Sequence, residues 1–270
     1  MSETGRTNSE HRRMPIVFAG HGSPMNAIED NPWSRGFTLL RDEVPQPKAI
    51  LSISAHWFLD GTLLMANAAP ETIADFSGFP RALYEIEYPA PGNVDLAKRV
   101  RDLIGNQHAS LNSDWGLDHG TWSVLRWMYP EADVPVIQLS IDRRMDVREH
   151  FRLARSLADL REEGVLIFTS GNIVHNLRDA FARRKENNTK TPDWAQRFDE
   201  TVKAMLTQRD TDALLSAWSD TSDGRLAHPT PEHWLPLIYA YGASDDRDQA
   251  RFPNEGFDWG SISMRNVVLG

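Results

Sequence analysis

The chain has 270 residues, of which 40% are hydrophobic and 25% charged, a composition typical of globular proteins rather than disordered, collagen-like or membrane proteins. With 38 acidic and 29 basic residues, its formal charge of −9 disfavours nonspecific binding to nucleic acid or to anionic lipid. The absence of cysteine excludes disulfides, thiolate metal sites and a cysteine nucleophile, so any metal must be bound by His, Asp or Glu.

The first segment, Met1 to Arg13, is polar and lacks the apolar core of a signal peptide. We interpret it as a disordered leader or tail. No stretch approaches the roughly 18 consecutive apolar residues of a membrane span, and a cytoplasmic location is therefore predicted. Residues 14–270 are predicted to form one domain, because no repeat and no linker rich in Ser, Gly or Pro divides them.

Short apolar runs alternate with longer amphipathic stretches along the rest of the chain. The apolar runs predict buried strands at 15–19, 49–54, 134–139, 165–169 and 262–268, with 62–66 as a hairpin partner of the second. The amphipathic stretches predict helices at 94–104, 122–128, 147–160, 194–206 and 211–218. This alternation indicates an α/β fold with one mainly parallel or mixed sheet flanked by helices.

Several of the nine histidines stand where predicted strands end. His21 follows the first strand, His56 follows the second, and His175 follows the fourth after a Gly171-Asn172 turn that is predicted to open a helix. Ligands of open α/β sheets bind outside the carboxyl ends of the strands, so these three side chains are expected to face one crevice. Neutral imidazole suits iron, zinc, copper and nickel, and three such ligands leave coordination positions open for a substrate.

The other histidines divide into two groups. His119 lies in a turn before a helix, and His228 and His233 lie in the proline-rich run from 228 to 236. The remaining three stand in a polar tail, a loop and a charged helix, and are predicted to face solvent: His11, His108 and His150. A histidine at a turn can also be a hydrogen-bonded structural residue, and this alternative stays open for each candidate.

Other motifs carry less information. Ser23 follows a glycine turn but lacks the G-x-S-x-G spacing of a nucleophile, so it is predicted to form the turn or to contact substrate. Trp57, Trp122 and Trp234 each follow a candidate histidine closely; most tryptophans are expected in the core, and some in the wall of an apolar pocket for an aromatic ligand. The polar segment 183–190 is interpreted as a solvated helix end and loop without function.

Five short motifs occur in one order along the chain. They are Gly20-His21-Gly22-Ser23-Pro24, Ser54-Ala55-His56-Trp57, Asp118-His119-Gly120-Thr121-Trp122, Gly171-Asn172-Ile173-Val174-His175-Asn176 and His228-Pro229-Thr230-Pro231-Glu232-His233. From about Met14 to the C-terminus, the chain resembles the 4,5-DOPA extradiol dioxygenase family. This family is a branch of the class III extradiol dioxygenases, which include the catalytic subunit of protocatechuate 4,5-dioxygenase.

The resemblance implies a mononuclear metal site. In it, His21, His56 and His233 hold one divalent ion per chain, with His175 adjacent as acid/base or as a further ligand. It implies Fe(II) for activity and Zn(II) in the isolated protein. The wider class uses two histidines and a glutamate, so a third histidine is a departure of this branch. Glu232 is the only neighbouring carboxylate, and its role stays open.

The resemblance also implies a reaction. A catechol such as DOPA and O₂ are the expected partners, without nucleic acid or membrane, and the ring opens next to one hydroxyl, outside the diol. His175 is expected to move the catechol proton, since imidazole titrates near neutrality. His119 is placed among the catalytic residues, and Ser23 and His228 near the substrate. Oligomeric state is not predicted.

Two other functions are compatible with the same histidines. Three histidines around Zn²⁺ with one open position also describe a hydrolase that lowers the pKa of bound water. A metal-storing or structural metal-binding protein is the non-enzymatic alternative, and a coordination sphere closed by four protein ligands would favour it.

Overall fold

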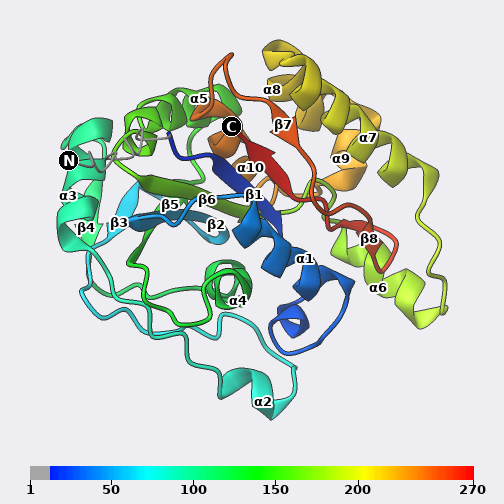
Figure 1. Ribbon diagram of the computed structural model, residues 1–270. Helices are drawn as coiled ribbons and strands as arrows, with labels where there is room; N and C mark the ends of the chain where they lie inside the picture. Colours follow the sequence, from blue (N-terminus) through cyan, green and yellow to red (C-terminus); the bar gives the residue numbers. More distant parts are fainter. Residues whose placement is uncertain (1–12) are drawn as a thin grey trace, which may run out of the picture.

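The computed structural model describes residues 13–270, in which strands and helices alternate along the chain (Figure 1). The strands are β1 (Ile16–Gly20), β2 (Ala49–Leu59), β3 (Leu63–Met65), β4 (Ser110–Asn112), β5 (Val136–Asp142), β6 (Val165–Gly171), β7 (Ala250–Arg251), β8 (Phe257–Asp258), β9 (Ile262–Ser263) and β10 (Val267–Leu269). The α-helices are α1 (Pro32–Asp42), α2 (Arg81–Tyr84), α3 (Val94–Ile104), α4 (His119–Met128), α5 (Val147–Arg155), α6 (Leu177–Lys185), α7 (Asp193–Gln208), α8 (Thr211–Asp220), α9 (Ser222–Ala227) and α10 (Leu235–Gly242). Two short 3₁₀ helices complete the set, η1 (Pro24–Ala27) and η2 (Ala158–Arg161).

One mixed sheet forms the centre of the domain. Its eight strands lie in the order β4-β3-β5-β2-β6-β1-β10-β7. The four inner strands β5, β2, β6 and β1 are parallel, whereas β10 and β3 pair antiparallel with their inner neighbours β1 and β5. Parallel strands must be covered on both faces, and β1, β5 and β6 are buried at every residue. The predicted single α/β domain with a mixed sheet is confirmed.

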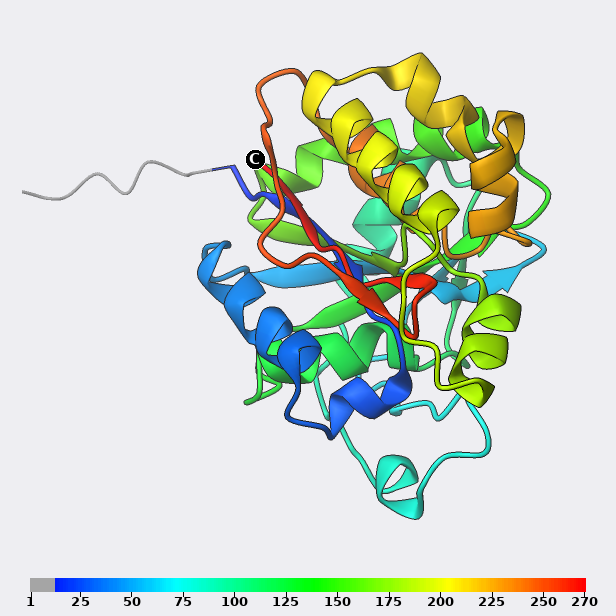
Figure 2. The same ribbon diagram turned by 90° about the vertical axis from the view of Figure 1, so that its right-hand side faces the viewer.

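Helices cover both faces of this sheet (Figures 1 and 2). On one face, α10 packs against β6 and β1 and contacts α5; on the other, α4 packs against β2 and β6 with α1 beside it. Every residue of α10 is buried. A helix that is apolar all round has no amphipathic period, which is why the sequence did not predict α10.

Three predicted elements differ from the structure. The strand at 63–65 pairs with β5 and β4 instead of forming a hairpin with β2, because β5 occupies that edge of β2. The helix predicted at 147–160 ends at Arg155, and η2 follows it. The strand predicted at 262–268 is split into β9 and β10, because Arg265 turns inward to pair with buried Asp199 and Asn266 accepts a hydrogen bond from the Gly20 amide.

The predicted leader lies outside the described residues except for Arg13. The guanidinium of Arg13 lies 2.9 Å from a carboxylate oxygen of Asp245 and 3.4 Å from one of Asp248. Asp248 also forms a buried ion pair with Arg161 at 2.7 Å. Arg13 therefore belongs to the folded chain, one residue before the predicted boundary. His11 lies outside the described residues.

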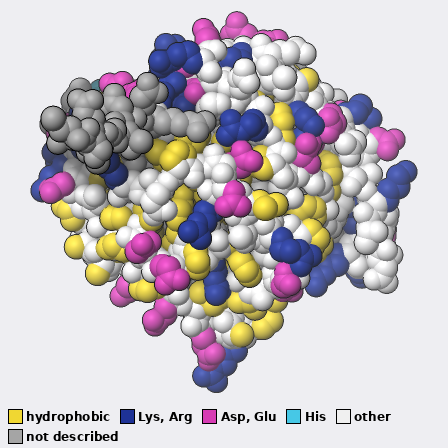
Figure 3. Space-filling view, viewed as in Figure 1, with side chains coloured by type: hydrophobic (Ala, Val, Ile, Leu, Met, Phe, Trp, Pro, Cys, Tyr) yellow, Lys and Arg dark blue, Asp and Glu magenta, His cyan; other side chains and the backbone are white. Residues whose placement is uncertain are grey.

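The surface carries basic and acidic side chains side by side on the face seen in Figure 3. Several exposed charges of the described residues are paired, such as Arg143 with Asp60 at 2.6 Å and Arg99 with Glu163 at 2.7 Å. Exposed pairs of this kind contribute little to stability, but they neutralise local charge. Among residues 13–270, every helix is too short or too polar to cross a lipid bilayer.

The solvent assignment is wrong for His150 and right for His108. His108 is exposed. His150 lies on the buried face of α5 with its Nδ1 atom 3.0 Å from the Tyr239 hydroxyl of α10. The charged residues around His150 suggested an exposed position in the sequence. However, Val147, His150 and Ala154 follow the i, i+3, i+7 spacing of one helix face.

Burial lowers the pKa of His150 from 6.5 to about 4, so the folded protein keeps this ring neutral where the unfolded chain protonates it. Because the unfolded state binds the extra proton, stability falls as pH decreases from about 6.5 towards 4. The slope is up to about 1.4 kcal/mol per pH unit for one such group. We expect His150→Gln to lose less stability than the unmodified protein between pH 7 and pH 5. Urea unfolding of metal-free protein measures this, and equal losses would contradict it.

Candidate metal centre and active site

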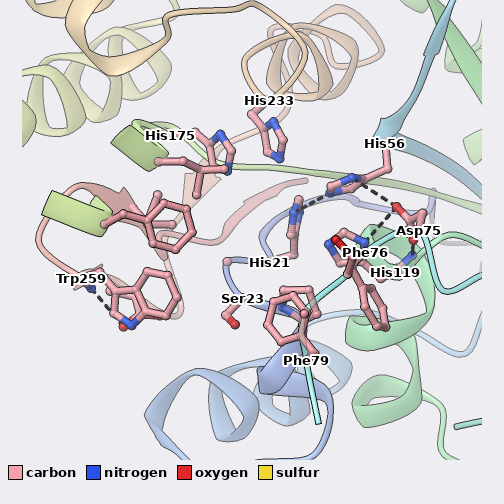
Figure 4. A pocket seen from close by; sticks show the side chains of 18 of the residues that line it. His21, Ser23, His56, Asp75, Phe76, Phe79, His119, His175, His233 and Trp259 are labelled. Carbon is pink, nitrogen blue, oxygen red and sulfur yellow. Dashed lines mark hydrogen bonds and ion pairs between the residues drawn. The ribbon is translucent and has the colours of Figure 1, made fainter. Parts of the chain in front are cut away.

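The carboxyl ends of the inner strands bring the predicted histidines together (Figure 4). His21 directly follows β1, and His56 lies in the last part of β2, which runs on to Leu59 beyond its predicted end. The pairing of β2 with β5 shifts register between Ile53 and Phe58. Such an irregularity redirects side chains locally, and His56 lies within this stretch.

His233, just before α10, completes a group of three. The ligand nitrogens of His21, His56 and His233 all lie within 4.8 Å of one another. The Nε2 atoms of His21 and His56 are 3.1 Å apart. Two nitrogens that are each about 2.0–2.1 Å from one ion lie roughly 3–3.5 Å apart, so this spacing fits a shared metal.

The neighbours of these rings favour the ligand form of each nitrogen. The Nδ1 atom of His21 is 2.9 Å from the Ser170 hydroxyl, and Nδ1 of His56 is 3.3 Å from a carboxylate oxygen of Asp75. With both Nδ1 atoms protonated, the two Nε2 atoms present lone pairs to each other. Two facing lone pairs repel, whereas both can bind one cation, so the donor set fits a divalent metal.

The three histidines are neutral when no metal is bound. Burial is the main reason that the pKa values of His21, His56 and His233 lie well below 6.5, and the charges of the neighbouring histidines add to it. Neutral imidazole is the form that binds metal, so no proton has to leave before an ion binds at neutral pH.

His233 is oriented by its sequence neighbour. Its Nδ1 atom lies 3.4 Å from Oε1 of Glu232, which also accepts a hydrogen bond of 2.8 Å from the Thr230 hydroxyl. The carboxylate of Glu232 is not a member of the group of three histidines, but it forms a second group with His175 and His233 whose ligand atoms also lie within 4.8 Å of one another. The sequence left the role of Glu232 open. This contact indicates that Glu232 orients the ring of His233.

His175 lies beside the group of three. Its ring is stacked on that of His233, with ring centroids 3.5 Å apart and planes inclined by 7°. The backbone fixes it, since the His175 N–H donates to the Ala227 carbonyl at 2.9 Å. Burial, with smaller effects of His228 and His119, lowers the pKa of His175 to about 3, so the ring is neutral.

The helix start predicted near Gly171 is displaced along the chain. Gly171 is the last residue of β6, and α6 begins at Leu177 after the N-cap Asn176. A Cβ atom at Gly171 would lie 2.4 Å from the His233 carbonyl oxygen. The glycine therefore permits close packing of β6 against the segment that carries His233, and a short loop, not a helix start, carries His175.

On the opposite side of the cluster, His119 forms a dyad with Asp75, a residue that the sequence analysis missed. His119 is the first residue of α4, after the N-cap Asp118. Its backbone N–H donates to Oδ1 of Asp75 at 2.8 Å, and its Nδ1 atom lies 2.9 Å from Oδ2. Asp75 stands in an irregular loop 44 positions before His119, and no local pattern connects the two residues.

Asp75 is held in its ionised form. Burial raises the pKa of this carboxyl, but the hydrogen bond and charge of His119 and the charge of His56 outweigh burial and lower it to about 2. One carboxylate thus contacts both the predicted ligand His56 and the predicted catalytic residue His119. Such carboxylates fix the tautomer and the orientation of metal-binding histidines.

We expect Asp75→Asn to reduce metal affinity roughly 10- to 100-fold, the usual cost of losing such an orienting partner. The amide keeps the size of the carboxylate but can present an N–H where His56 and His119 need an acceptor. Metal titration of the apo protein measures the loss. Asp60→Asn, which changes an exposed carboxylate paired with Arg143, is the matched control. Equal metal affinity in the two variants would show that Asp75 does not orient the cluster.

The structure separates the two residues predicted to contact substrate. Ser23 lines the cavity above the histidines, and its hydroxyl accepts a hydrogen bond from the Met25 amide at 3.2 Å, so it forms a turn as well. His228 is buried outside the cavity. Its Nε2 atom donates to the Ile173 carbonyl at 2.8 Å, which ties His228 to the loop that carries His175. The structure does not bring His228 to the cavity that the other histidines line.

The cavity has a volume of about 490 Å³ and holds His21, His56, His119, His175 and His233. Four aromatic side chains are part of its remaining wall: Phe76, Phe79, Phe181 and Trp259. The three tryptophans singled out in the sequence, Trp57, Trp122 and Trp234, are buried in the core and do not line it. Arg184, from the segment interpreted as functionless, does line it. A planar aromatic molecule suits this combination of flat apolar walls and a polar end.

Comparisons with known proteins agree with this geometry. Residues 14–270 match the family model described as the catalytic LigB subunit of aromatic ring-opening dioxygenase. The chain is 46% identical over 262 residues to a 4,5-DOPA dioxygenase extradiol of Escherichia coli K12, covering 96% of this chain and 95% of that protein. It is 38% identical to a protein of the same name from Beta vulgaris, covering 94% and 96%. A crystal structure of an uncharacterized Escherichia coli K12 protein superposes with a TM-score of 0.80 at 41% identity, covering 96% of this chain and all of the other.

Proposed function

Because the chain belongs to the family of the catalytic LigB subunit of aromatic ring-opening dioxygenases, it is an extradiol dioxygenase, and we propose that its substrate is a catechol such as DOPA. The single observation that carries this proposal is the placement of three neutral histidines at one end of an aromatic cavity. The named relatives act on DOPA according to their names, and the cavity volume leaves room for a substituted catechol.

We further propose that His21, His56 and His233 hold one divalent metal ion, Fe(II) for turnover and Zn(II) in the isolated protein. When bound there, Fe(II) would hold the catechol next to O₂ and pass electrons between them. The side chains supply the rest. Phe76 and Phe79 exclude water from the flat faces of the ring, and Ser23 offers a hydroxyl at the cavity wall.

Proton transfer is assigned to the two histidines that flank the group of three. His175, neutral and stacked on His233, is the proposed acceptor of the catechol hydroxyl proton. His119 faces the same cavity from the other side, and Asp75 holds its Nδ1 atom, which leaves Nε2 to hydrogen-bond a substrate oxygen. The cytoplasmic location stays a prediction.

The decisive experiment is turnover by the Fe(II)-loaded protein. Protein reconstituted without oxygen is mixed with DOPA, caffeate or protocatechuate, and air is then admitted. We expect oxygen uptake together with a yellow ring-opened product for at least one catechol. Zn(II)-loaded protein given ester substrates is the comparison. If the Zn(II)-loaded protein hydrolyses an ester and the Fe(II)-loaded protein takes up no oxygen, the protein is a zinc hydrolase and the dioxygenase assignment is wrong.

A further inference from the structure

The opening of the cavity carries one positive and one negative side chain. Arg184 of α6, Asp258 of β8 and the neighbouring Trp259 line the cavity and also an adjoining hollow of about 470 Å³ that contains Glu29. Arg184 is exposed, and Asp258 and Trp259 are partly exposed, so this end of the cavity reaches the surface. Among residues 13–270, Asp75 is the one other carboxylate that lines the cavity, and it is already engaged by His119. Arg184 and Asp258 remain for the substituent of a bound catechol.

The guanidinium of Arg184 is free for a ligand. Its Cζ atom lies 4.4 Å from the ring centroid of Trp259, and within residues 13–270 its N–H groups form no salt bridge. The next residue along the chain differs, since Arg183 is held by Asp179 at 2.5 Å and by the Lys190 carbonyl at 3.1 Å. Stacking on an aromatic face fixes the plane of a guanidinium and leaves its edge donors available for a carboxylate.

The carboxylate of Asp258 lacks a cationic partner at hydrogen-bond distance. Oδ1 accepts a hydrogen bond of 3.0 Å from the Trp259 backbone N–H, and no salt bridge to Asp258 is formed by any described residue. Burial raises the pKa of Asp258, and the charge of Glu29 adds to it, while Trp259 and Arg184 act in the opposite direction. A partly buried carboxylate of this kind gains stability from a bound cation.

The turn that presents these residues is conformationally costly. Trp259 has φ +48°, which a large side chain rarely adopts, and Gly260 follows with φ +76°. The tip packs against the end of α6, because a Cβ atom at Gly260 would lie 3.0 Å from Arg183 Cδ and from the Lys190 carbonyl oxygen. A left-handed tryptophan persists only where its surroundings fix it. Here the turn places the indole of Trp259 at the cavity (Figure 4), and Asp258 lines the same cavity.

We propose that Arg184 binds the α-carboxylate and Asp258 the α-ammonium group of an amino acid whose side chain is the catechol. The site would then select catecholic amino acids over simple catechols. This inference rests on the proposed function, since it presumes that the catechol lies at the histidines. Arg184 and Asp258 carry opposite charges at the opening of the cavity, and the histidines lie at its far end. Aromatic side chains form part of the wall between them. A zwitterion matches both charges, whereas a substrate with one charge leaves the other unpaired.

The test crosses four catechols with three variants. DOPA carries both charges, dopamine only the ammonium, 3-(3,4-dihydroxyphenyl)propionate only the carboxylate, and 4-methylcatechol neither. We expect Arg184→Gln to lower kcat/KM roughly 10-fold for DOPA and for the propionate, but less than about 2-fold for the other two. Asp258→Asn should lower kcat/KM by a similar factor for DOPA and dopamine, and less than about 2-fold for the propionate and 4-methylcatechol. Arg178→Gln, the same change on an exposed residue of α6 that does not line the cavity, should leave all four unchanged.

Two outcomes separate this inference from the proposed function. If the unmodified protein turns over none of the four catechols, the dioxygenase function itself fails. If it turns over 4-methylcatechol as well as DOPA, and if neither variant shows a charge-selective loss, only the assignment of Arg184 and Asp258 is overturned. Anaerobic calorimetric titration of DOPA gives a second readout, because Arg184→Gln should weaken binding by a similar factor without any turnover.

Discussion

Replacing His21, His56 or His233 by alanine is expected to remove both the bound metal and all measurable dioxygenase activity. Each residue supplies one of three nitrogens within 4.8 Å of one another, and no fourth described side chain belongs to that group. Two remaining imidazoles hold a divalent ion far more weakly than three, and without the ion catechol and O₂ have no common binding point.

Metal content after dialysis, measured by elemental analysis, and oxygen uptake with DOPA test this expectation. His108→Ala is the matched control, because His108 is exposed and lies outside the cluster. Circular dichroism and urea unfolding of each variant show whether the fold is retained, because His21 and His233 are buried. Full metal occupancy in any one variant would remove that residue from the ligand set, even if activity were lost.

The order of strands explains why the sequence could predict this convergence. His21 and His56 follow or end apolar runs that form neighbours of β6 in a parallel sheet, and the carboxyl ends of such strands lie at one edge. The proximity of His21 and His56 could therefore be predicted from two local features, an apolar strand and the histidine after it. His233 follows no strand, and only the family resemblance pointed to it as a ligand.

Asp75, Arg184 and Trp259 show what a single sequence does not reveal. Each stands in a loop, a helix end or a short hairpin, where no hydrophobic period marks which side chain points inward. Asp75 reaches His119 across 44 positions, and Trp259 meets Arg184 only because the β8–β9 turn packs on α6. Contacts of this kind depend on how loops are placed by the whole domain.

His150 and His228 show the converse limit. The exposure of His150 was inferred from its charged neighbours, and the place of His228 near the substrate from the family resemblance. Both are buried with a structural hydrogen bond, to Tyr239 and to the Ile173 carbonyl. Residue type predicts chemistry only after burial and partners are known. In this chain the cavity separates histidines that face a substrate from those that hold helices and loops in place.

Replacing His175 by alanine is expected to leave the metal in place while turnover falls roughly 10²- to 10⁴-fold, the usual range for losing a general acid–base group. The structure supports this division of roles. His175 is absent from the group formed by His21, His56 and His233, although its ligand atom lies within 4.8 Å of those of Glu232 and His233, and its ring is stacked on that of His233 with centroids 3.5 Å apart. It therefore stands next to the proposed metal position without belonging to the proposed set of three ligands.

Three measurements on this variant distinguish the roles: metal content, anaerobic DOPA affinity and kcat. Retained metal and DOPA affinity with a large fall in kcat identifies the acid–base residue, because ground-state binding does not require the proton transfer. Loss of metal would make His175 a ligand, and near-normal turnover with full metal would make it a structural residue of the loop. His119→Ala serves as the parallel variant, since His119 faces the same cavity with its Nδ1 atom held by Asp75. If the large fall in kcat appears there and not in His175→Ala, then the proton moves on the side of the His119–Asp75 dyad.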